Sequence, residues 1–215
     1  MFKDRRHAAQ ELAKHLTGYS GADTLVLGIP RGGVEIAYYI AISLNADFSL
    51  VIARKLGYPE HPEAAFGAIA EDGSTYLSSS ARSFVSENEI KEVKKREKKE
   101  LERRIQVLRE GKPLPSLEGR VIILADDGIA TGATLFATIM LCKKQKPAKI
   151  IVAAPISSRR MESDLRDLVD DVIILEKPRD FYAVSQGYRH FDNLTDEETI
   201  SFVNSWEKEH QETDN

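Results

Sequence analysis

The sequence contains only one cysteine, Cys142, among its 215 residues. A single cysteine cannot form an internal disulfide, so the class of small disulfide-stabilised domains is excluded and a reducing compartment is favoured. Cys142 lies in an apolar stretch with helical spacing. We therefore expect a buried thiol without a catalytic role.

Long apolar runs are also missing from the sequence. No stretch approaches the ~20 apolar residues that a membrane-spanning helix needs. The opening residues, MFKDRRHAAQ, lack the apolar core of a secretory signal. We therefore expect a cytoplasmic protein that has no membrane partner.

An excess of basic residues is absent as well. The 30 lysines and arginines are outnumbered by 34 aspartates and glutamates, which gives a formal net charge of −4. This balance argues against a nucleic-acid partner that is bound through general basicity. The chain length suits one sizeable core, so we expect a single domain over residues 1–215.

Short apolar runs alternate with stretches of helical periodicity along the chain. Asp72-Gly73 is a strong hairpin signal and predicts one antiparallel strand. The pattern predicts an α/β fold with three layers (α/β/α), in which helices cover both faces of a mostly parallel twisted sheet. The apolar runs predict its buried strands at 24–29, 48–53, 122–125, 149–154 and 171–175.

A charged helical segment is predicted over residues 86–111. Ser86 and Glu89 have the spacing of a capping box, and Gly111 is a stop signal. The lysine-rich run 94–99 is typical of a solvated helix face because acids are interleaved with it, and RNA binding is the alternative. A lid and a dimer arm are two further roles for this helix. Two pairs have the i,i+4 spacing of favourable ion pairs, Glu92/Arg96 and Glu100/Arg104.

The stretch 122–134 carries the clearest chemical signal. Its apolar start predicts a buried strand, and Asp126 and Asp127 follow at the carboxyl end, where open α/β sheets bind ligands. Residues 128–134 then form a Gly- and Thr-rich turn into a helix, whose free amides attract anions. Two carboxylates beside an anion-binding turn suit a sugar phosphate. The alternative is a strand that ends in a plain Asp-Asp-Gly turn.

A second strand–loop–helix anion site follows the strand 24–29. Its loop is Pro30-Arg31-Gly32-Gly33, in which two glycines let backbone amides approach an anion closely. It is not a Walker loop, because no Gly-Lys-Ser/Thr follows. A plain turn is the alternative. Arg54 and Lys55, at the end of the strand 48–53, add positive charge at the same edge of the sheet.

Residues 122–134 resemble the phosphoribosyl pyrophosphate (PRPP) motif of type I phosphoribosyltransferases at every defining position, and 30–33 resemble the pyrophosphate loop of that family. The resemblance implies a phosphoribosyltransferase-like fold and transfer of the 5-phosphoribosyl group from PRPP to a purine- or pyrimidine-like base, with release of pyrophosphate. It implies Mg²⁺ as cofactor, reached by Asp126 and Asp127 through water. A homodimer and a role in nucleotide salvage and nucleoside metabolism are family expectations.

The resemblance also implies roles for individual residues. Asp126, Asp127, Arg31 and Lys55 would carry catalysis by holding the ribose and by stabilising the departing pyrophosphate. The hood segment 176–215 would supply an aromatic side chain that stacks on the base. The candidates for that contact are Phe181 and Tyr182, with Tyr188 third. The residues expected to bind PRPP are Arg31, Gly32, Gly33, Arg54, Lys55, Asp126, Asp127, Gly128, Ile129, Ala130, Thr131, Gly132, Ala133 and Thr134.

The acceptor base stays open. Members that use 6-oxopurines have an aspartate where this chain has Ala130, and adenine-type members differ from this chain after Arg54-Lys55. A non-catalytic regulator that binds PRPP or a nucleotide is the alternative function, but it would need a DNA-binding element or a basic RNA face. A phosphate-accepting receiver domain would need acids at the end of the first strand, where Gly28-Ile29-Pro30 stand.

Overall fold

The computed structural model describes residues 1–62 and 64–211. Its main sheet has five strands in the order β2-β1-β6-β7-β8, and every neighbouring pair is parallel. Most strands that follow one another along the chain are neighbours in the sheet, and only the connection from β2 to β6 passes over a strand, β1. The strands are β1 (Thr24–Gly28), β2 (Asp47–Leu50), β6 (Val121–Ala125), β7 (Lys149–Ile156) and β8 (Asp171–Glu176).

Both faces of this sheet are covered by helices, so the predicted three-layer α/β fold is confirmed. Neighbouring residues of a strand point to opposite faces. Val26 and Ile123 accordingly pack on the side of α1, α2 and α7, whereas Leu25 and Ile122 pack on the side of α5 and α6. The helices are α1 (Arg5–His15), α2 (Gly32–Leu44), α5 (Ala133–Lys144), α6 (Arg159–Arg166) and α7 (Asp196–Gln211).

A separate antiparallel sheet replaces the single antiparallel strand that the sequence predicts. It has the order β3-β4-β5. The expected hairpin at Asp72-Gly73 is confirmed: Asp72 accepts a hydrogen bond from the amide of Ser74, and Gly73 has a φ of 86°. The strands are β3 (Ala53–Gly57), β4 (Ala65–Ala70) and β5 (Thr75–Leu77).

The predicted strand 48–53 is wrong as one element, because the chain changes sheets within it. The amide of Val51 still donates to Gly28 of β1, but the amide of Ile52 donates to the carboxylate of Glu71, beside the hairpin turn. From Ala53 onward the chain pairs with β4. Arg54 and Lys55 therefore lie inside β3 and not after a strand.

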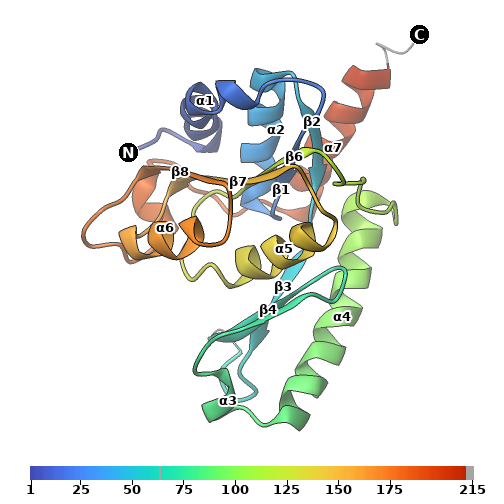
Figure 1. Cartoon of the computed structure of the whole chain (residues 1–215), viewed down its shortest axis with the longest axis vertical. Coiled ribbons are helices and arrows are strands. Elements are labelled where there is room, and N and C mark those ends of the chain that lie inside the picture. The colour runs from blue at the N-terminus through green and yellow to red at the C-terminus, as the bar shows by residue number, and fades with distance from the viewer. Residues whose placement is uncertain (63, 212–215) are drawn as a thin grey trace.

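The predicted charged helix is α4 (Glu87–Arg109), which runs beside the antiparallel sheet (Figure 1). Its capping box is confirmed: Ser86 accepts from the amide of Glu89, and Glu89 accepts from the amide of Ser86. The short α3 (Ala81–Phe84) precedes it, and the 3-10 turns η1 (Thr17–Tyr19) and η2 (Val184–Gly187) complete the elements. Within the described ranges, no helix has the length and apolar character to cross a membrane.

Arg109, the last residue of α4, ties this helix to both sheets. Its Nη1 donates to the carbonyl of Leu50 at 3.0 Å, and its Nη2 forms an ion pair with Glu71. The two side chains are 5% and 9% exposed. The carboxylate of Glu71 also accepts a hydrogen bond from the amide of Ile52. The ion pair between Arg109 and Glu71 therefore fixes the point where the chain passes from one sheet to the other.

Replacing Arg109 by alanine should destabilise the fold. The substitution leaves the buried carboxylate of Glu71 without its counter-ion, and breaking such a pair costs about 3–5 kcal/mol. Urea denaturation measures this loss. Arg103→Ala is the matched control, because Arg103 is 51% exposed and its surface pair is worth about 1 kcal/mol or less. Equal losses in the two variants would contradict the role given to Arg109.

Candidate functional site

Asp126 and Asp127 directly follow β6 at the carboxyl edge of the parallel sheet. The side chain of Asp126 accepts a hydrogen bond from the amide of Asp127 at 2.9 Å. Burial is the main cause that raises the pKa of Asp126 well above its ordinary value; the nearby charge of Asp127 adds to the shift, and Lys55 opposes it. Two close carboxylates in a poorly solvated place are thus set to bind hydroxyl donors or a cation.

Arg5 is the ion-pair partner of Asp127. Its Nε lies 2.8 Å from Oδ2 of Asp127, and the side chains are 7% and 16% exposed. Nη1 of Arg5 donates to the carbonyl of Asp192, and the guanidinium lies 4.2 Å from the centre of the Phe191 ring. Burial, the largest cause, leaves the pKa of Asp127 above its ordinary value, although the charge and hydrogen bond of Arg5 lower it. The pair therefore favours the ionised form of Asp127 at this edge of the sheet.

Arg5 is a site residue that the motifs do not reveal. It comes from the first position of α1, far from the motifs in sequence. One feature of the sequence could have identified it. Arg5 lies three, four and seven residues before Ala8, Ala9 and Leu12, which are buried, so it is on the same face of the helix. A charged residue in line with an apolar helical stripe is expected to be buried with a partner.

The loop 30–33 touches the acid pair directly. A Cβ on Gly32 would lie 1.7 Å from Oδ2 of Asp127, and a Cβ on Gly33 would lie 2.6 Å from the carbonyl oxygen of Ala125. No side chain fits in either place. The structure therefore brings together the two strand–loop–helix sites that the sequence predicts separately, and glycine is required at their contact.

The turn 128–134 leaves backbone amides available. Ala130 and Thr131 are exposed, and Gly132, the residue before α5, has a φ of 69°. Among the described residues, no side chain caps the N-terminus of α5, and none caps that of α2 after Arg31. Asp4, Ser86 and Ser158, by contrast, cap α1, α4 and α6. Free N–H groups at the two helix starts beside the acids form an anion-binding arrangement.

A cavity of about 450 Å³ lies beside the two helix starts, and its lining residues include neither Asp126 nor Asp127. Pro30, Lys55 and Thr134 line it, so all three predicted stretches contribute to it. Arg54 also lines it and forms an ion pair with Glu97 at 3.0 Å. Lys55 is exposed, which leaves its ammonium accessible from this space. The size is within the range of small-molecule sites, about 300–1,000 Å³.

Helix α4 supplies the remaining charged wall of this cavity, through Arg96, Glu97 and Arg104. The sequence predicts a solvated face or a lid here and singles out none of the three as site residues. A signal is present, because Glu97 and Arg104 recur in the same helical stripe as the buried Leu101. The predicted Glu100/Arg104 pair is confirmed at 3.2 Å. The predicted Glu92/Arg96 pair is wrong, because Arg96 instead pairs with Glu97 at 3.0 Å.

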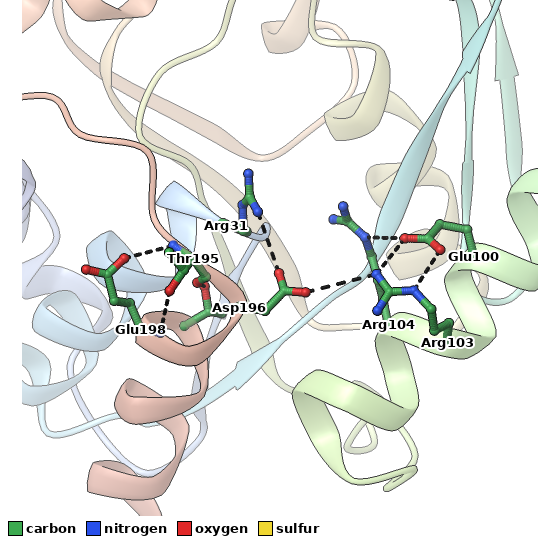
Figure 2. Close-up of polar contacts among 8 residues, drawn as sticks. Arg31, Glu100, Arg103, Arg104, Thr195, Asp196 and Glu198 are labelled. Atoms are coloured by element: carbon green, nitrogen blue, oxygen red, sulfur yellow. Dashed lines mark hydrogen bonds and ion pairs between the residues drawn. The ribbon is translucent and has the colours of Figure 1, made fainter.

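Acidic side chains hold the arginines around the site in place (Figure 2). Asp196, in the first turn of α7, lies 3.7 Å from Nη1 of Arg31 and 4.0 Å from Nη2 of Arg103. Glu100 binds Arg103 and Arg104. Figure 2 shows that Asp196 lies between the loop arginine and α4. Each partly exposed pair is weak by itself, so an incoming anion can compete with these acids for Arg31 and Arg104.

The aromatic candidates of the hood segment lie in different surroundings. Phe181 is half-buried and packs against the core, and Tyr182 is 83% exposed. Tyr188 is buried; its hydroxyl donates to the carbonyl oxygen of Asp127 at 2.5 Å, and its ring stacks on Phe191. Burial, with the charge of Asp127, raises the pKa of Tyr188. Tyr188 therefore supports the backbone of the acid pair.

Comparisons with known proteins identify the family of this chain. The family model described as phosphoribosyl transferase domain matches residues 1–192. Proteins from two strains of Mycobacterium tuberculosis, whose names describe them provisionally as phosphoribosyl transferases, are 38% identical over 205 residues. The match covers 94% of this chain and 46% of each relative, so the chain spans about half their length.

A solved structure extends this similarity to the fold. The crystal structure of TT1426 from Thermus thermophilus is 33% identical to this chain and has a TM-score of 0.81. The match covers 96% of this chain and 99% of that one. The family model and these relatives together cover the acid pair, both anion-binding loops and α4. The chain therefore belongs to the phosphoribosyl transferase domain family.

Proposed function

We propose that this protein transfers the 5-phosphoribosyl group of PRPP to a nitrogenous base and releases pyrophosphate. The observation that carries the proposal is the contact between the two loops: Gly32 lies against Asp127, so the two uncapped helix starts flank the acid pair. PRPP carries a phosphate at one end, a ribose diol in the middle and a pyrophosphate at the other end. Two anion sites that flank two acids match this order of groups.

Each part of PRPP has proposed partners. The 5′-phosphate binds the amides of residues 130–134 and the hydroxyls of Thr131 and Thr134. The ribose hydroxyls donate to Asp126 and Asp127. The pyrophosphate binds the loop 30–33 with Lys55, and it recruits Arg31 and Arg54 from their acidic partners, Asp196 and Glu97. Arg104, which lines the cavity beside Lys55, donates a further hydrogen bond to the pyrophosphate. Charge-assisted hydrogen bonds of this kind are about twice as strong as neutral ones.

The proposed reaction breaks the bond between C1 of the ribose and the pyrophosphate oxygen, while a nitrogen of the base bonds to C1. Negative charge leaves on the pyrophosphate, where Lys55, Arg31 and Arg54 stabilise it. Positive charge develops on the ribose, near the carboxylates of Asp126 and Asp127. Arg5 orients Asp127 and opposes the rise in its pKa that burial causes. Catalysis then comes from positioning and from fixed charges.

Mg²⁺ is the proposed cofactor, and the donor set agrees with an ion that the substrate helps to bind. Asp126 and Asp127 offer carboxylate oxygens, but the described part of the chain contains no group of three or more His, Cys, Asp or Glu that could hold a metal. Mg²⁺ commonly keeps several waters and uses one or two carboxylates with substrate phosphates. When bound, it would neutralise pyrophosphate charge. Phe181 and Tyr182 stay the proposed contacts of the base.

Asp127→Asn should lower pyrophosphate release by about 10²–10³-fold, the usual effect of removing one fixed electrostatic partner of the reacting group. Turnover of PRPP with Mg²⁺ is measured across purines, pyrimidines and orotate. Asp164→Asn is the control, because Asp164 is on α6 and its pair with Arg160 is exposed. If the wild-type protein binds PRPP but none of these bases gives pyrophosphate, the alternative of a non-catalytic PRPP or nucleotide regulator is correct.

Arg104→Gln should weaken PRPP binding by about 10-fold or more, since a lost hydrogen bond to a charged group is worth about 1.5–3 kcal/mol. Arg104 lines the cavity beside Lys55, and Arg103, its neighbour on α4, is outside that lining. Arg103→Gln is therefore the matched control and should leave the affinity within about twofold. Calorimetric titration with PRPP and Mg²⁺ measures both. Equal affinities in the two variants would remove α4 from the proposed site.

PRPP affinity should fall on mild acidification, through protonation of Asp126. The pKa of this carboxyl is raised, mainly by burial. It therefore takes up a proton at a higher pH than an ordinary aspartate, whose pKa is about 3.9, and a protonated carboxyl accepts ribose hydroxyls poorly. Titrations between about pH 5 and 8 test this. In the Asp126→Asn variant, the pH dependence that arises from Asp126 should disappear, and only the pH dependence due to the phosphates of PRPP should remain. If the variant has the same pH profile as the wild-type protein, Asp126 is not the group responsible.

A further inference from the structure

A second cavity, of about 460 Å³, lies between α4 and the turn of the β4–β5 hairpin. It shares no lining residue with the cavity of the candidate site. Ile69 and Leu101, both buried, contribute an apolar lining. Four lysines of α4 form one wall: Lys91, Lys94, Lys95 and Lys98. We call this space the lysine cavity.

The four lysines form a continuous stripe on α4. They are separated by three and four residues, so they are neighbours on one face of the helix. Like charges at this spacing destabilise a helix. Among the described residues, none of the four lysine side chains has a hydrogen bond or ion pair. Their mutual repulsion is therefore not relieved by any described part of the chain.

The two acids that border the lysine cavity, Glu71 and Asp72, are already paired with other cations. Asp72 accepts Nζ of Lys144 at 3.0 Å and the hydroxyl of Ser74, and these contacts lower its pKa against the opposing effect of burial. Glu71 is paired with Arg109. Each acid thus has a cation from outside the lysine stripe, and the cavity keeps an excess of positive charge although the whole chain has a net charge of −4.

We propose that the lysine cavity binds a nucleoside polyphosphate. The lysines would hold its phosphates through charge-assisted hydrogen bonds, and the base would lie against Ile69 and Leu101. The volume is within the range of about 300–1,000 Å³ for small-molecule sites. A fully solvated lysine face would not need an apolar lining or a bounded volume. The proposal does not depend on PRPP turnover, because no residue of the candidate site takes part.

Helix α4 links the two sites by position. Val93, Glu97 and Leu101 form its buried seam. The lysine stripe flanks this seam on one side, and Arg96 and Arg104 line the candidate site from the other. A nucleotide in the lysine cavity would therefore contact the helix that also forms a wall of the candidate site.

Calorimetric titration of the full chain with ATP tests the proposal. Lys94→Glu should weaken ATP binding at least 10-fold, whereas Lys99→Glu should change it by less than twofold. The two variants have the same change in net charge on the same helix, but Lys99 does not line the cavity. Arg104→Gln, in the candidate site, should leave ATP affinity unchanged. Thermal melting confirms that the surface variants are folded.

Several outcomes would overturn the proposal. One is that the wild-type protein does not bind ATP. Another is that Lys94→Glu and Lys99→Glu lose ATP affinity equally. A third is that only Arg104→Gln loses ATP affinity, which would locate ATP in the candidate site. Tripolyphosphate should bind at least fivefold more weakly than ATP, because it has no base to place on Ile69 and Leu101; equal affinity would also refute a nucleoside ligand. A single-stranded RNA that binds more tightly than ATP, with equal sensitivity to both lysine variants, would identify a nucleic-acid surface instead.

Discussion

The buried ion pair between Arg5 and Asp127 is the interaction on which the site depends. A carboxylate that is 16% exposed is costly to ionise without a cation close by. Arg5 supplies that cation from the N-terminal helix and also binds the carbonyl of Asp192 in the segment after the last strand. Tyr188 from the same segment binds the backbone of Asp127. Three distant parts of the chain thus meet at one acid.

The same acid sets the distance between the two anion-binding loops. Gly32 lies so close to Asp127 that any side chain there would displace the carboxylate. The starts of α2 and α5 are therefore held on either side of the acids, with their amides free of caps from the described side chains. A rigid placement of fixed dipoles and charges is what phosphoryl and pyrophosphate groups need, because such groups are stabilised mainly by preorganised donors.

Helix α4 gives this protein features that the motifs do not contain. Its buried seam packs beside the antiparallel sheet, and its two flanks border separate cavities with different chemistry. On one flank the arginines are matched by Glu97 and Glu100, whereas on the other the lysines have no described partner. One charged helix therefore provides lysines without a described partner to one cavity and paired arginines to the other, because helical periodicity places residues that are adjacent in sequence on different faces.

The sequence by itself determined the layered α/β architecture, the acid pair at the end of β6, both glycine-containing loops, the hairpin at Asp72-Gly73 and the capping of α4. These features depend on residues close together in the chain, whose spacing records local geometry. The tertiary structure alone decided the division of the run 48–53 between two sheets, the pairing of Arg5 with Asp127, and the position of Arg96 and Arg104 at the cavity. Each of these depends on a partner distant in sequence, such as Glu71 for Ile52, and a single sequence does not record which distant residues meet.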